Sequence, residues 1–205
     1  MTNLVELLQG QLTEGLIDQL SEQLGGADKQ QTAAAANGAL STIIGALAKN
    51  AATPEGVSGL AKALDKDHDG SILDNLLGAV TGQAAPGLER AMNGAGILKH
   101  VLGDRQSSAA DMISQMSGLS SGQSGNLMAI LAPIVMGMLG KQKKENNLGL
   151  DDLASILTGT VSQQRQNNNP IMDLATRFLD KDGDGSIVDE AAGLGMKILG
   201  SLFKK

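Results

Sequence analysis

Apolar residues recur at three- and four-residue steps along nearly the whole chain, as Leu40, Ile43 and Leu47 illustrate. No stretch sustains the two-residue alternation that is typical of a half-buried strand. Only Phe178 and Phe203 are aromatic, so Ala, Leu, Ile, Gly and Met must supply the core. Helices pack through such small side chains, whereas a β-sandwich normally uses more aromatic and β-branched residues. The sequence therefore predicts an all-α fold, a multi-helix bundle.

Capping signals and polar stretches divide this pattern into segments. Thr53-Pro54 and Asn169-Pro170 each place a capping residue before a proline at the first helical position. Helices are predicted near residues 2–9, 12–24, 29–50, 54–64, 72–82, 86–101, 108–117, 123–141, 149–163, 170–179 and 187–203. Flexible joints are predicted at residues 25–26, 103–107, 141–147 and 163–169.

The chain contains an internal repeat. Residues 64–74, LDKDHDGSILD, match residues 179–189, LDKDGDGSIVD, and the alignment also places Val57 over Met172 and Leu64 over Leu179. Each copy is predicted to be a helix, an acidic loop and a second helix. Two regions follow from this division: an N-terminal helical region, 1–103, with the first loop, and a C-terminal helical region, 104–205, with the second.

Both acidic loops, 65–74 and 180–189, follow the pattern D-x-D-x-D-G. A hard cation with six to eight oxygen ligands needs oxygens that converge on one point, and alternate residues of a tight turn supply them at loop positions 1, 3 and 5. Glycine at position 6 permits the positive φ of the bend, and the carbonyl of position 7 and an acid at position 10 follow. The predicted calcium ligands are Asp65, Asp67, Asp69, Ser71 and Asp74 in the first loop and Asp180, Asp182, Asp184, Ser186 and Asp189 in the second.

These loops resemble the calcium loops of EF-hand and EF-hand-like proteins. At position 12, where an EF-hand has a bidentate glutamate, this chain has Leu76 and Ala191. The pattern D-x-D-x-D-G-x-x-x-[DE] is similar to the shortened loops of bacterial calcium modules, including the type called excalibur. The resemblance implies Ca²⁺ as the cofactor. The missing glutamate couples ion binding to helix opening in EF-hands, so a structural or buffering role is favoured over a sensor.

A metal-free interpretation stays open for the same residues. Residues 71–74 and 186–189 also match a capping box, and Asp-Gly turns end helices without any ion. Magnesium is a further alternative. Three aspartates at alternate positions repel one another unless a cation or solvent relieves them, and ligands that are all oxygens favour calcium over zinc or copper. His68, at position 4, is predicted to be an exposed side chain.

Several function classes are disfavoured by composition. The formal net charge is −6, from 16 basic and 22 acidic residues, so the chain has no positive excess for a nucleic-acid backbone. It has no cysteine, and its other histidine, His100, is predicted to be solvated or to cap a carbonyl at a helix end. No Ser-His-Asp set is visible. We therefore expect a protein that is not an enzyme.

Membrane insertion is not expected either. The most apolar stretch, residues 127–139, contains Pro133 and is shorter than the roughly 20 residues that span a bilayer. It is predicted to be a central buried helix, with an oligomer or client-binding surface as the alternative. The amphipathic tail, residues 194–205, is expected to dock on the core, with binding to a membrane surface as the alternative. Glu6 and Glu14 lie where a secretory signal would be basic or apolar, which predicts a cytoplasmic protein.

The segment GAGILKHVLG, residues 94–103, and the Ala/Leu/Gly-rich texture of residues 1–140 resemble a bacterial family of YidB-like proteins. That resemblance implies a helical cytoplasmic protein of unknown role and transfers no catalytic residue. The glycines at 94, 96, 137 and 140 lack phosphate-loop spacing and are predicted to permit close helix approach.

The predicted function is that of a non-enzymatic calcium-binding protein with a structuring or buffering ion. The alternative is a helical scaffold, with a second copy or another protein as its partner, in which the loops are joints that need no metal.

Overall fold

The computed structural model describes residues 4–81 and 89–180. Over these ranges the backbone forms α-helices and short 3-10 helices and contains no β-strand, which confirms the all-α prediction. The elements in chain order are α1 (Leu4–Gln11), α2 (Glu14–Gln23), α3 (Lys29–Ala51), α4 (Pro54–Asp67), the 3-10 helix η1 (Ser71–Asn75), α5 (Leu76–Thr81), α6 (Gly94–Leu102), the 3-10 helix η2 (Gly103–Arg105), α7 (Gln106–Ser117), α8 (Ser121–Glu145), α9 (Leu150–Gln166) and α10 (Pro170–Leu179).

Most of these elements agree with the predicted helices, with three differences. Helix α8, predicted to end at residue 141, extends to Glu145. The helix predicted at 86–101 begins only at Gly94, because residues 89–92 form a turn and Asn93 caps the helix by accepting a hydrogen bond from the Gly96 N–H at 2.9 Å. The helix predicted at 72–82 starts with the 3-10 turn η1. The helix predicted at 187–203 lies outside the described residues.

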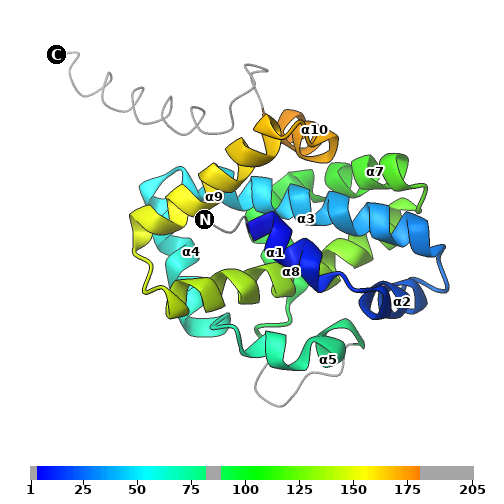
Figure 1. Cartoon of the computed structure of the whole chain (residues 1–205), viewed down its shortest axis with the longest axis horizontal. Coiled ribbons are helices and arrows are strands. Elements are labelled where there is room, and N and C mark those ends of the chain that lie inside the picture. The colour runs from blue at the N-terminus through cyan, green and yellow to red at the C-terminus, as the bar shows by residue number, and fades with distance from the viewer. Residues whose placement is uncertain (1–3, 82–88, 181–205) are drawn as a thin grey trace.

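Helix α3 occupies the middle of the molecule. It packs against α7, α8, α9 and α10, and Figure 1 shows it crossing the centre, with α10 on one side and α5 on the other. One hydrophobic cluster joins buried residues from Leu4 to Leu179, so it draws on both predicted regions. Residues that the repeat aligns with each other are buried in both copies: Val57 and Met172, and Leu64 and Leu179.

Helix α8 is the second central element. Every residue from 131 to 140 is buried, which confirms the prediction of a central apolar helix. Within the described part of the chain α8 is also the one helix long and apolar enough to cross a membrane, with a mean hydropathy of 1.3 over its most apolar window. Because 67% of that window is buried inside the protein, its hydropathy fits a core helix.

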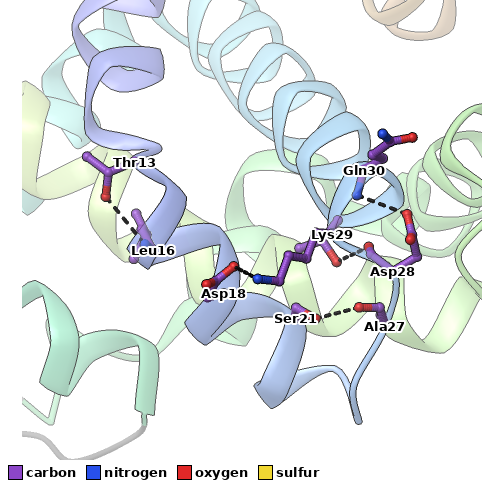
Figure 2. A network of polar contacts seen from close by, with 9 residues as sticks. Thr13, Leu16, Asp18, Ser21, Ala27, Asp28, Lys29 and Gln30 are labelled. Atoms are coloured by element: carbon purple, nitrogen blue, oxygen red, sulfur yellow. Dashed lines mark hydrogen bonds and ion pairs between the residues drawn. The ribbon is translucent and has the colours of Figure 1, made fainter.

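The junction between α2 and α3 is fixed by polar contacts (Figure 2). The carboxylate Oδ1 of Asp28 accepts a hydrogen bond from the Gln30 N–H at 2.9 Å. It accepts a second from the Gln31 N–H at 3.0 Å, and the two bonds cap α3. The Lys29 ammonium lies 2.6 Å from the Asp18 carboxylate of α2. These contacts set where the central helix begins.

Replacing Asp28 with alanine is therefore expected to lower the free energy of unfolding by about 1 kcal/mol, since two N–H groups of the first turn lose their acceptor. Asp28→Asn keeps an acceptor oxygen and should stay within a few tenths of a kcal/mol of the original chain. Denaturant unfolding of the three proteins tests this, and equal losses in both variants would contradict a capping role.

Candidate metal site

The first acidic loop begins inside a helix. Helix α4 continues to Asp67, so Asp65 and Asp67 belong to its last turn, and His68 is the C-cap residue. Gly70 has φ +98°, a conformation that L side chains rarely adopt. The sharp bend predicted at position 6 is therefore present, while the acids at positions 1 and 3 have helical backbone.

Two glycines of α8 bring the loop against the core. A Cβ on Gly140 would lie 1.7 Å from the carbonyl oxygen of His68, and a Cβ on Gly137 would lie 2.3 Å from Cγ2 of Ile72. Neither distance is possible for real atoms, so this contact needs both glycines. Close approach was predicted for these positions. Gly140 meets the backbone of the loop, and Gly137 meets the side chain of Ile72 in the 3-10 turn that follows it.

The packing of the loop on α8 overturns the prediction for His68. Its side chain is buried, with 6% of its surface exposed, although position 4 of a free-standing loop would face solvent. Within the described residues its Nδ1 atom has no hydrogen-bond partner. Burial lowers the pKa of His68, against an opposing effect of the Asp67 carboxylate. His100, in contrast, lies exposed in the last turn of α6.

Two lysines of α8 form ion pairs with carboxylates of the first acidic loop. Lys143 forms an ion pair with Asp65, and the Nζ atom of Lys144 lies 3.6 Å from Oδ2 of Asp69. The hydroxyl and the N–H of Ser71 donate to Asp69 and, together with Lys144, hold the pKa of that carboxyl below its usual range. The flexible joint predicted at residues 141–147 is wrong over its first five residues, because α8 extends to Glu145 and its lysines contact the loop. The joint predicted at 103–107 is also wrong, since η2 and α7 cover it, and the joint predicted at 163–169 is wrong over its first four residues, since α9 extends to Gln166.

Four of the five predicted ligands of the first loop line two surface hollows, and Asp65 lines neither. Asp67, Asp69 and Ser71 line the first, together with Glu89. Asp69, Ser71 and Asp74 line the second, beside Lys141 and Lys144 of α8. In residues 4–81 and 89–180, no three acidic or histidine side chains converge closely enough to hold a metal ion. The loop thus has oxygen donors and the required bend, but its carboxylates form no closed ligand set in this conformation.

Glu89 was not found by sequence reasoning. It lies outside the acidic loop, inside the helix predicted at 86–101, and no local pattern connects it with the D-x-D-x-D-G motif. Its place beside the first hollow follows from the turn at residues 89–92 that precedes α6.

Of the second loop only Asp180 lies within the described residues; Asp182, Asp184, Ser186 and Asp189 lie outside them. Asp180 is the C-cap of α10, and its N–H donates to the Thr176 carbonyl at 2.8 Å. The carbonyl of Leu179 accepts hydrogen bonds from Lys49 at 2.7 Å and from Arg105 at 2.8 Å. Two cations therefore hold the helix end from which the second loop starts.

Comparison with known proteins places the chain in a family. The sequence profile of a family of bacterial proteins of unknown function, DUF937, matches residues 6–142, which is more than half of the chain. The chain belongs to the DUF937 family. The DUF937 match is consistent with the resemblance to YidB-like proteins, includes the first acidic loop and ends before the second. Neither a curated protein nor a solved structure gives a significant match.

Proposed function

We propose that this chain is a non-enzymatic protein that binds calcium through its acidic loops and uses the ion for structure or buffering. The observation that carries the proposal is the first hollow, where residues at loop positions 3, 5 and 7 lie together: Asp67, Asp69 and Ser71. The positive φ of Gly70 at position 6 supports it, and so does the second copy of the motif. Carboxylate and carbonyl oxygens are the ligands that Ca²⁺ prefers.

The lysines of α8 make weak binding the expected outcome. Calcium must displace the ammonium groups of Lys143 and Lys144 from Asp65 and Asp69 before these carboxylates can turn to the ion. The glutamate of position 12 is also missing. We therefore expect a dissociation constant of about 10⁻⁴ M or weaker, an affinity in the range of extracellular calcium modules.

Calorimetric titration of calcium into the chelator-treated full chain tests the proposal. The expected result is two saturable sites in the original chain, one in each of Asp67→Ala and Asp182→Ala, and none in the double variant. Asp104→Ala, which removes an exposed acid outside both loops, should keep both sites. The absence of heat and of thermal stabilisation at millimolar calcium would overturn the proposal.

A further prediction concerns Lys143. Lys143→Met removes the ammonium group that competes for Asp65, so calcium affinity is expected to rise by roughly two- to ten-fold, equivalent to about 0.4–1.4 kcal/mol. Lys99→Met makes the same charge change on the exposed face of α6 and serves as the control. An equal gain in both variants would show that net charge, and not competition at the loop, sets the affinity.

The same ion pairs favour one alternative function, a helical scaffold whose loops are metal-independent joints. In this alternative the lysines of α8 are the permanent partners of Asp65 and Asp69. Sedimentation of the full chain with calcium and with chelator separates the two functions. Assembly that is identical in both solutions, together with no calorimetric signal, is the result expected of the scaffold.

A further inference from the structure

A groove with a volume of about 390 Å³ lies between α4 and α6. Its buried floor is apolar and comes from three helices, with Leu47 on α3, Leu60 on α4 and Met136 on α8. Both histidines of the chain line it, His68 in the interior and His100 at the exposed surface. The groove therefore joins an apolar interior to a polar rim, as small-molecule sites do.

Hydrogen-bond acceptors line the α3–α4 side of the groove. The amide nitrogen of Asn50 donates to the carbonyls of Ala46 at 2.8 Å and Val101 at 2.9 Å, so its oxygen is left as an acceptor. The carboxylate of Asp67 is the second acceptor on this side. A ligand that binds here needs a donor.

Donors line the opposite side. The amide oxygen of Asn93 accepts the Gly96 N–H at 2.9 Å, which leaves its NH₂ group as a donor. Arg90, in the turn before α6, adds a guanidinium with five N–H donors. A ligand that binds here needs an acceptor.

Asp67 and Arg90 are the two formally charged side chains of the groove lining. Both also line the first hollow of the acidic loop, so they lie at the same end of the groove. Within the described residues, they form no ion pair with each other or with any neighbour. A ligand with a positive and a negative group close together could form an ion pair with each of these two side chains.

We propose that this groove binds a free α-amino acid with an aliphatic side chain. The ammonium group pairs with Asp67, and the carboxylate pairs with Arg90 and Asn93 at the same end of the groove. The aliphatic side chain packs on the apolar floor. A residue at the end of a peptide lacks one of these two charges and an internal residue lacks both, so the free amino acid fits better. This site does not rest on the proposed calcium function.

NMR titration of the ¹⁵N-labelled full chain in buffer with chelator tests the proposal, with L-leucine as the probe. We expect saturable shifts of the His68, Asn93 and Ile97 resonances. The analogues 4-methylpentanoate, which lacks the ammonium group, and 3-methylbutylamine, which lacks the carboxylate, should bind at least ten-fold more weakly. No saturation up to about 20 mM leucine, or an analogue that binds as tightly as leucine, would overturn the proposal.

Two variants locate the binding site. Gly59 lines the groove, and a Cβ there would meet nothing within 4 Å, so Gly59→Leu should fill the groove without disturbing the helix. It is expected to abolish leucine binding, whereas Gly122→Leu, at an equally open position of α8, should not. Arg90→Gln should weaken leucine at least ten-fold and leave 3-methylbutylamine unchanged. Leucine binding to Gly59→Leu with the original affinity would place the site elsewhere and contradict the proposal.

Discussion

Replacing Gly140 with alanine is expected to lower the free energy of unfolding by about 3 kcal/mol. The new methyl group would lie 1.7 Å from the His68 carbonyl oxygen and 2.8 Å from its carbonyl carbon. Both atoms belong to the backbone, which cannot rotate away as a side chain does. Either α8 or the acidic loop must therefore move, and the buried packing of Ile72 on α8 is lost with it.

Gly122→Ala is the matched control for this experiment. It makes the same substitution on the same helix, where a Cβ meets nothing within 4 Å, and alanine should stabilise the helix there by up to about 1 kcal/mol. Denaturant unfolding of the two variants should therefore give effects of opposite sign. Stabilisation of both would show that the loop does not rest on Gly140 in solution. Hydrogen exchange at residues 68–73 provides a local readout, and it should become faster in Gly140→Ala.

The second large effect is expected at Gly94, the first residue of α6. A Cβ there would lie 1.7 Å from the Ala129 carbonyl oxygen and 2.6 Å from its carbon. Pro133 has no N–H, so this carbonyl lacks its ordinary helical donor, and α6 begins directly against it. Gly94→Ala should cost about 3 kcal/mol, because α6 must separate from α8.

Gly159→Ala, in the open part of α9, is the control for Gly94→Ala and should be neutral or stabilising. Thermal unfolding of both variants measures the difference. A further check is Gly94→Ser, which adds a still larger side chain at the same place and should be at least as destabilising. Tolerance of serine would mean that α6 and α8 are farther apart than the structure shows.

The helices were predictable because their signals are local. Thr53 caps α4 through a 3.0 Å bond from the Gly56 N–H, and Asn169 caps α10 through a 3.0 Å bond from the Ile171 N–H. A capping residue before a proline is visible in any sequence. The end of α8 was missed because KQKKENN resembles a solvated linker, and the carboxylate that Lys143 contacts lies 78 residues earlier.

The sequence predicted which acidic residues belong to the site but not how they are arranged in space. The motif identified the acids and the bend at Gly70, since both depend on residues a few positions apart. The burial of His68 depends instead on a contact with Gly140, and the position of Glu89 depends on how α6 meets α8. Long-range packing decides both, so no local pattern could reveal them.

The docking of α10 on α3 has a consequence for how the chain is made. Leu179 packs against Gly45, and its carbonyl binds Lys49, a residue 130 positions earlier. A ribosome adds about 5–20 residues per second. Roughly 6–26 s therefore pass between the synthesis of Lys49 and that of Leu179. During that interval an apolar stripe of the central helix is without its native cover. The order of synthesis thus makes α3 a segment of the nascent protein that needs protection from aggregation.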